Sequence, residues 1–296
     1  MLVQPICGRT WMFQNAVTIP FFRLNDREVI LLDSGFFSKD RQALHDYLRD
    51  NHLRVAAILG THAHQDHAGN LAYFQQCHGA EIILPEAEAA FLSSVDMIRV
   101  LYPTDTRVQA QDSFAHLLVR ADRTYPSGQS EIQVQGETFG LLPLPGHTPG
   151  HTGIVTPDDI LYAADAVVDE ETLSRIRLPS TFCWEDDFAS KEMLRHQVHR
   201  GYLLAHAGYH ADLHALIDRN LAERQMQLQA ILALLYRPMS LSEFEQEVWQ
   251  NLNLSCHTVM GIIKFRRNLR CALEYLLSIG AVRLVFQDGL TQYQQA

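Results

Sequence analysis

The stretch RVAAILGTHAHQDH, residues 54–67, joins an apolar run to four side chains that can bind metal ions. Residues 54–59 show the short, continuous apolar pattern of a buried strand. His62 and His64 are two positions apart, so on an extended segment they project to the same side, and Asp66 and His67 follow where a helical pattern begins. Imidazole and carboxylate groups together suit zinc, iron or manganese. The stretch therefore predicts a strand that delivers metal ligands at its carboxyl end.

Four further apolar runs end in a residue that can bind a metal. They are VILLD, LLPLPGH, ILYAAD and YLLAH, which end at Asp33, His147, Asp165 and His206. Buried strands in layered α/β folds bring their carboxyl ends to a common edge, where functional groups collect. We expect these residues to converge on the pocket formed by residues 62–67.

The rest of the chain alternates strand and helix patterns, which predicts an α/β layered architecture. Residues 1–34 read as a β-meander, and residues 86–127 as either a cover over the site or an ordinary surface excursion. After His210 the pattern becomes three helices and a hairpin around Asp288-Gly289. This is the plan of a winged helix, so we place a domain boundary near residue 220, with a catalytic domain at 1–220 and a winged-helix-like domain at 221–296.

Two stretches resemble motifs of a known family. HAHQDH, residues 62–67, matches the HxHxDH signature of metallo-β-lactamase-fold hydrolases, and PGHTPGHT, residues 145–152, matches their third motif. This superfamily includes glyoxalase II, lactonases and lactamase-like endoribonucleases. The resemblance implies an αββα sandwich with a two-metal site between the sheets, and the C-terminal pattern resembles the endoribonuclease subgroup.

The resemblance also implies a ligand set. It consists of His62, His64 and His147 for one metal, Asp66, His67 and His206 for the other, and Asp165 as a bridge. Asp33 is implied to support the site by hydrogen bonding, and His151 to order its loop. Relatives often read Gly-His-Gly around the last ligand, but this chain reads Ala205-His206-Ala207, which leaves His210 as an alternative.

The implied activity is hydrolysis by a metal-bound hydroxide. Two divalent ions, most simply zinc, with iron or manganese as alternatives, make hydroxide available at neutral pH. Asp66 would orient the nucleophile or accept its proton. We expect a small ester, thioester or lactone as substrate. The common zinc β-lactamases carry cysteine at the position of Asp165, so antibiotic hydrolysis is not the expected native role. Iron-dependent oxidation of sulfur species is a less favoured alternative.

Charge and composition bear on the partners. The net charge is −10, and residues 221–296 carry seven basic and six acidic side chains, so the acidity lies in residues 1–220. This disfavours nucleic acid as the partner. The winged-helix pattern and the basic run Lys264–Arg270 keep a nuclease or phosphodiesterase as the alternative function. A homodimer contact or a cover over the active site are other interpretations of the C-terminal module.

Other features predict location and specificity. Five cysteines without CxxC spacing, no signal-peptide pattern and no membrane span predict a cytoplasmic protein that does not associate with membranes. Specificity is expected in the loops at 86–127 and 167–182. Arg175 and Arg177 are candidate anchors for a substrate anion, and Tyr209 and His210 are candidate donors beside the metals.

Overall fold

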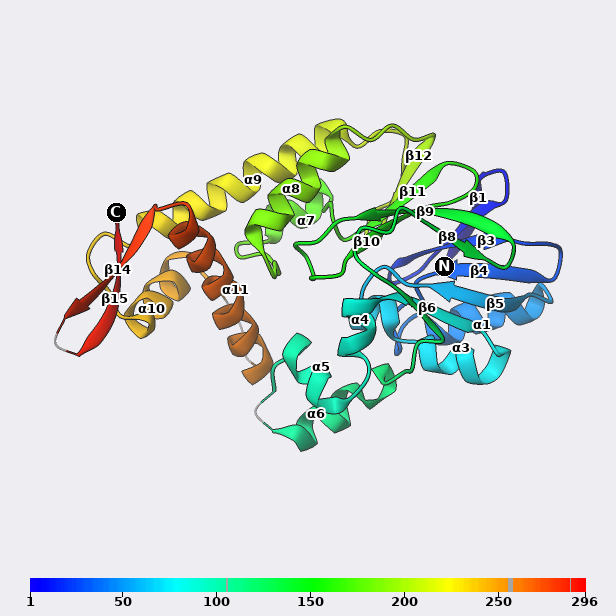
Figure 1. Cartoon of the computed structure of the whole chain (residues 1–296), viewed down its shortest axis with the longest axis horizontal. Helices are drawn as coiled ribbons and strands as arrows, with labels where there is room; N and C mark the ends of the chain where they lie inside the picture. The colour runs from blue at the N-terminus through cyan, green and yellow to red at the C-terminus, as the bar shows by residue number, and fades with distance from the viewer. Residues whose placement is uncertain (105, 255–257, 288) are drawn as a thin grey trace.

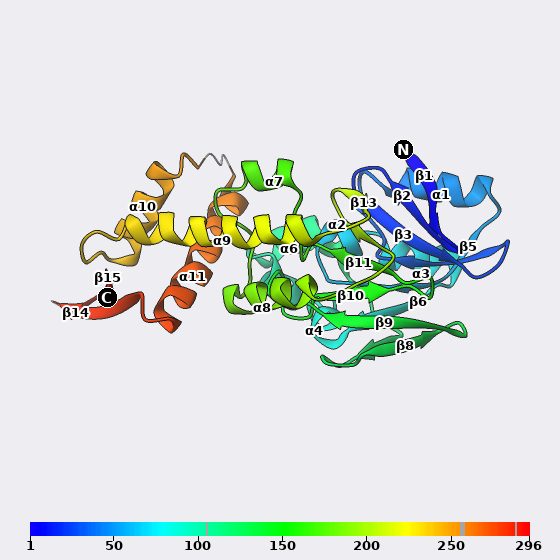
Figure 2. The same cartoon turned by 90° about the horizontal axis from the view of Figure 1, so that it is seen from above.

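The structure is a computed structural model that describes residues 1–104, 106–254, 258–287 and 289–296. Two β-sheets stack against each other, and helices cover their outer faces (Figures 1 and 2). The first sheet follows chain order: β1 (Leu2–Cys7), β2 (Thr10–Gln14), β3 (Thr18–Arg23), β4 (Glu28–Leu32), β5 (Arg54–Leu59), β6 (Glu81–Pro85) and β7 (Arg123–Tyr125). The second has the order β13 (Gly208–His210), β12 (Gly201–Leu204), β11 (Ile160–Ala164), β10 (Thr152–Val155), β9 (Glu137–Pro143) and β8 (Glu131–Val134).

Three apolar layers account for this arrangement. Between the sheets, Phe22 meets Phe139 edge to face with ring centroids 5.6 Å apart. Under the first sheet, Leu44 of α1 (Arg41–Asp50) and Phe74 of α3 (Leu71–His78) are fully buried. Over the second, Leu194 of α8 (Trp184–Arg195) packs with residues of β11 and β12. The predicted αββα sandwich is confirmed.

Parallel pairing brings the carboxyl ends of several strands to one edge. β4, β5, β6 and β7 pair in parallel in the first sheet, and β11 pairs in parallel with β12 in the second. The register between β11 and β12 shifts after Tyr162, and Ala164 adopts a φ of 48° in the left-handed region. An irregularity of this kind re-aims the side chain that follows. It therefore sets the direction of Asp165.

Residues 86–117 form short helices beside the first sheet: α4 (Glu86–Phe91), α5 (Val95–Leu101), α6 (Arg107–Phe114) and a 3₁₀ turn, η1 (Ala115–Leu117). α4 and α5 are separate helices, although only three residues lie between them. The chain breaks because Ser94 is extended and its hydroxyl accepts a bond from the Met97 amide, which starts α5 afresh. Two further short helices flank the site, α2 (Gln65–Ala68) and α7 (Glu170–Arg175).

The C-terminal region contains α9 (His214–Ala233), α10 (Leu241–Asn251), α11 (Val259–Ser278) and the hairpin β14 (Val282–Gln287) with β15 (Leu290–Gln295). Ser240 caps α10 through a reciprocal capping box with Glu243. These elements share a hydrophobic cluster that includes Phe244, Leu269 and Leu276. The domain boundary predicted near residue 220 falls inside α9, which runs from the sandwich to the C-terminal elements (Figure 1). The winged-helix interpretation stays a prediction.

Two expectations concern residues outside the described ranges, Asp288 of the hairpin turn and Cys256. The other four cysteines are free thiols. None of the described helices combines the length and apolar character that crossing a membrane requires.

Candidate metal centre

The structure brings the seven predicted ligands together at the carboxyl edge of the sheets. Their donor atoms form two groups, each within 4.8 Å: His62, His64, His147 and Asp165, and Asp66, His67, Asp165 and His206. Asp165 belongs to both groups. The assignment of these residues as ligands is a proposal that the following geometry supports.

The first group is compact. Nδ1 of His64 lies 3.0 Å from Nε2 of His62 and 2.8 Å from Nε2 of His147. Nε2 of His147 is also 3.3 Å from Oδ2 of Asp165. Donors of a tetrahedral zinc site, each 2.0–2.1 Å from the ion, lie about 3.3 Å apart. The spacing thus fits four donors around one small cation.

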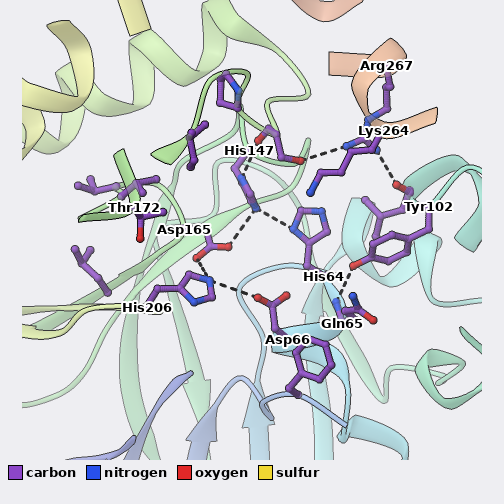
Figure 3. A pocket seen from close by; sticks show the side chains of 18 of the residues that line it. His64, Gln65, Asp66, Tyr102, His147, Asp165, Thr172, His206, Lys264 and Arg267 are labelled. Atoms are coloured by element: carbon purple, nitrogen blue, oxygen red, sulfur yellow. Dashed lines mark hydrogen bonds and ion pairs between the residues drawn. The ribbon is translucent and has the colours of Figure 1, made fainter. Parts of the chain in front are cut away.

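The second group has similar spacing. Nε2 of His206 lies 3.4 Å from Oδ2 of Asp66 and 3.5 Å from Oδ1 of Asp165, and Nε2 of His67 lies 3.4 Å from Oδ2 of Asp165. These separations are long for hydrogen bonds but suit donors that share an ion. Figure 3 shows the His206 ring between the carboxylates of Asp165 and Asp66.

Buried polar atoms supply an independent test of whether a cation fits. Nε2 of His67 and Oδ1 of Asp165 are buried and have no hydrogen-bond partner in the described structure. Such atoms are costly unless something else satisfies them. Nδ1 of His147 lies 3.1 Å from the carbonyl oxygen of Ser180, so it must donate its proton there, which leaves a lone pair on Nε2 facing the other donors. The residues present fit divalent cations.

Asp33 orients the second group from behind. Its carboxylate accepts bonds from the Thr61 amide, the Thr61 hydroxyl and Nδ1 of His67, each at 2.7 Å. Because Nδ1 of His67 donates to Asp33, Nε2 faces the site with its lone pair when the imidazole is neutral. Asp33 thus has the supporting position expected for it, although its backbone φ of 66° was not foreseen.

Glu88 of α4 joins the two motifs, and the sequence analysis missed it. Its fully buried carboxylate accepts bonds from the Ala63 amide at 2.8 Å, the Thr148 hydroxyl at 2.8 Å and the Gly150 amide at 2.7 Å. Ala63 lies between two histidines of the first group, and Thr148 follows His147. Glu88 therefore fixes the relative position of the HAHQDH and PGHTPGHT loops. The sequence signal that could have indicated Glu88 was weak: an acidic residue three positions after the apolar run of β6.

His151 lies behind the site. Its Nε2 accepts a bond from the Asp165 amide at 3.3 Å, and burial, followed by the neighbouring His147, lowers the pKa of His151 to about 3. A neutral imidazole can serve as this acceptor. The contact is consistent with the loop-ordering role expected from the sequence.

The donor groups lie at the wall of a cavity of about 480 Å³, a volume typical of small-molecule sites. Apolar residues line part of it, among them Phe36, Val168 and Ile176, and α11 contributes Met260, Lys264 and Arg267. Tyr102 is also in the wall, and its hydroxyl oxygen accepts a bond from the Gln65 amide at 2.7 Å (Figure 3). Burial first, and then Asp66, raise the pKa of Tyr102 well above its ordinary value, so it keeps a proton to donate.

Four predicted site residues lie elsewhere. Arg175 and Arg177 are not among the described residues that line the cavity, and the Arg175 guanidinium pairs with Glu171 one turn earlier in α7. Tyr209 and His210 lie in β13, and neither belongs to the donor groups or the cavity wall. The geometry therefore gives no support to Arg175 or Arg177 as anchors or to Tyr209 and His210 as donors at the metals. Of the two alternatives for the last ligand, it favours His206.

Burial and neighbouring charges shift the pKa values of the histidines in the two donor groups in opposite directions. Burial, then the other histidines, hold the pKa of His62 well below its ordinary value. The facing carboxylates of Asp165 and Asp66 raise the pKa of His206 to about 10. Burial alone would raise the pKa of Asp66, but His67 and His206 lower it to about 2. Without a cation, protonated His67 and His206 offset the negative charges of Asp66 and Asp165 in the second group.

A pH dependence of metal binding follows. The pKa of His206 rises from about 6.5 in the unfolded chain to about 10, so its proton stabilises the metal-free fold fully below pH about 6.5. That stabilisation is lost as the pH rises through about 10. A cation must displace this proton, so affinity should increase up to about tenfold per pH unit in this window.

Calorimetry of Zn²⁺ binding at pH 7.5, in two buffers of different ionisation enthalpy, checks this point and should show proton release. Replacing His214, an exposed histidine whose pKa is raised by Asp212, with glutamine should leave the release unchanged. Buffer-independent heats for the wild-type protein would contradict the expectation.

Comparison with known proteins agrees with the fold and identifies the family. A sequence model described as the Metallo-beta-lactamase superfamily matches residues 10–225. A probable metallo-hydrolase from Streptococcus pyogenes is 27% identical over 54% of this chain and 66% of its own length. A hydroxyacylglutathione hydrolase from Vibrio parahaemolyticus is 28% identical over 53% of this chain and 46% of its own length. The chain thus matches only about half to two thirds of these curated relatives.

Among solved structures, a metallo-beta-lactamase family protein from Thermus thermophilus superposes with a TM-score of 0.71. The match covers 95% of this chain and 94% of that one at 22% identity, so it bears on the fold alone. Three observations point to the same family: the sandwich, the two donor groups and the match over residues 10–225. The chain belongs to the metallo-beta-lactamase superfamily, a family of hydrolytic enzymes that bind divalent metal ions.

Proposed function

We propose that this chain is a hydrolase that uses two divalent ions to cleave a small ester, thioester or lactone. The observation that carries the proposal is the pair of donor groups that share Asp165 at the wall of a 480 Å³ cavity. Ions at such a site lower the pKa of water and polarise a carbonyl oxygen. The relatives named hydroxyacylglutathione hydrolase support an acyl compound as the substrate.

The residues around the cavity have distinct tasks in this proposal. Asp66, with a pKa of about 2, is a weak base, so we assign it to cation binding and to orienting water by accepting a hydrogen bond. Tyr102 keeps its proton and faces the cavity, where it can donate to a substrate oxygen. The apolar wall at Phe36, Val168 and Ile176 would exclude water from the acyl group.

Chelation is the direct test. Removing the ions should reduce hydrolysis of at least one ester, thioester or lactone by about 10²-fold or more, because water is then no longer acidified. An ion present at about 1,000 times its Kd also stabilises the fold by about 4 kcal/mol, so the free energy of unfolding should fall on chelation.

The measurement is a panel of lactones, thioesters, phosphodiesters and β-lactams, run on protein of known metal content before chelation, after it and after adding Zn²⁺, Mn²⁺ or Fe²⁺ back. Preferred turnover of phosphodiesters would contradict the substrate class. Activity that persists without metal would contradict the mechanism.

A further inference from the structure

The C-terminal helix α11 contributes basic side chains to the cavity that holds the donor groups. Lys264 and Arg267 line this cavity with residues of the sandwich, although they lie more than 50 positions beyond His206 in the sequence. Figure 3 shows Lys264 extending toward His64 and His147. α11 thus forms a wall of the site.

Three lysine and arginine side chains line the cavity, and two of them are engaged by the protein. Arg224 lies 3.3 Å from the Asp187 carboxylate and 3.2 Å from the Gln227 amide oxygen. Arg267 donates to the Leu101 carbonyl oxygen at 2.7 Å and lies 3.4 Å from the Ser180 hydroxyl. Within the described residues, no hydrogen bond or ion pair joins the Lys264 ammonium group to a partner.

The position of Lys264 makes its unpaired ammonium group relevant to the site. Lys264 is exposed to solvent, and its side chain forms part of the cavity wall beside the donor groups. The pKa of Lys264 lies below its ordinary value, first because burial removes water from the ammonium group and then because Arg267 is near. Asp66 and Asp165 act in the opposite sense, but both belong to the donor groups.

Other cations of α11 behave differently. Arg266 pairs with Glu245 of α10 at 3.0 Å, and Arg270 is exposed and does not line this cavity. Lys264 is exposed as these two arginines are, but of the three it is the one that lines this cavity. Its side chain extends toward the donor groups, where two bound cations would add to the positive potential (Figure 3).

We propose that Lys264 binds an anionic group of the substrate, a carboxylate or a phosphate, a few bonds away from the scissile carbonyl. The inference rests on the proposed hydrolytic function and adds a substrate class to it, because neutral esters lack this contact. A hydrogen bond that involves charged groups is worth about 10- to 100-fold in binding. Lys264 is thereby a determinant of specificity that acts on the substrate directly.

Matched thioesters provide the kinetic test with the metal-loaded protein. The compounds are S-acetyl-3-mercaptopropionate, its neutral amide, and S-acetyl-2-mercaptoethyl phosphate. Lys264→Gln should raise KM for one or both anionic compounds about 10- to 100-fold with little change in kcat, and should leave the neutral amide unaffected. Which anion is affected distinguishes a carboxylate from a phosphate substrate. Lys264→Arg should restore part of the affinity.

Arg270→Gln is the matched control, because it removes one positive charge from the same helix outside the cavity. It should change kcat/KM less than twofold for all three compounds. Equal losses for anionic and neutral compounds in Lys264→Gln, or no loss at all, would overturn the proposal.

A binding measurement separates this inference from the proposed function. N-acetyl-β-alanine, its neutral amide and N-acetyl-2-aminoethyl phosphate keep the shape of the three thioesters without a thioester bond. Calorimetry should show that the wild-type protein prefers one or both anions to the amide and that Lys264→Gln loses this preference. If no thioester is hydrolysed, the thioester activity fails while this measurement still decides the role of Lys264. Equal binding of all three compounds by the wild-type protein, or no binding, overturns that role.

Discussion

Replacing Asp165 with alanine is expected to abolish hydrolysis, with a loss in kcat/KM of at least about 10³-fold, because acidified water is no longer available. Asp165 is the one residue that belongs to both donor groups among the described residues. Its loss also leaves His67 and His206 without the carboxylate that faces them at 3.4 and 3.5 Å. Elemental analysis should find fewer than two ions per chain, measured beside kcat/KM.

Asparagine variants separate charge from shape in this experiment. Asp165→Asn keeps the size of the side chain and should still lose most of the activity. Asp169 lines the same cavity and caps α7 through its side chain, a role that asparagine also performs. Asp169→Asn should therefore retain metal and most of the activity. Full metal content and more than a tenth of the activity in Asp165→Ala would refute the bridging role.

Replacing Glu88 with alanine is expected to destabilise the fold and loosen the metal site together. Two backbone amides and a threonine hydroxyl lose a buried charged acceptor, which costs about 3–5 kcal/mol. At about 2–4 °C per kcal/mol, Tm should fall by about 10 °C. Metal affinity should fall by about 10- to 100-fold, the usual effect of losing a residue that orients ligands.

Thermal unfolding and Zn²⁺ titration of the same preparations measure both effects. Glu86→Ala is the matched control, since Glu86 is exposed on the same short helix. Glu88→Gln should have an intermediate Tm and metal affinity. Its amide nitrogen cannot accept a hydrogen bond, whereas both oxygens of the Glu88 carboxylate do. A Glu88→Ala protein with wild-type Tm and affinity would show that other contacts fix the two loops.

The strand ends could be predicted from the sequence because an apolar run changes abruptly there to a polar residue that can bind metal. β4, β5, β11 and β12 are apolar runs, and within a few residues each is followed by a polar residue of the centre. The αββα fold came from the family resemblance of two motifs. β10 was not foreseen because Thr152–Val155 is short and follows a loop rich in glycine and proline. α7 and β13 were too short to produce a period.

Contacts between segments that are distant in the chain could not be predicted from the sequence. Glu88 looks like any acid on a short helix until α4 is placed beside the two histidine loops. Lys264 was interpreted within a basic run that could meet nucleic acid, yet in the structure it faces the cavity. Arg175 and Arg177 had the required charge, but the wall that they were expected to join is formed by other residues. These roles depend on packing, which local patterns do not encode.

The division of the cavity between sandwich and α11 bears on how such a protein diversifies. All seven candidate ligands lie between residues 62 and 206, whereas Met260, Lys264 and Arg267 belong to a helix more than 50 residues later. Mutations in that helix can alter which molecules are accepted while the reactive apparatus stays intact. New preferences can therefore arise by single steps that leave an inherited chemistry unharmed.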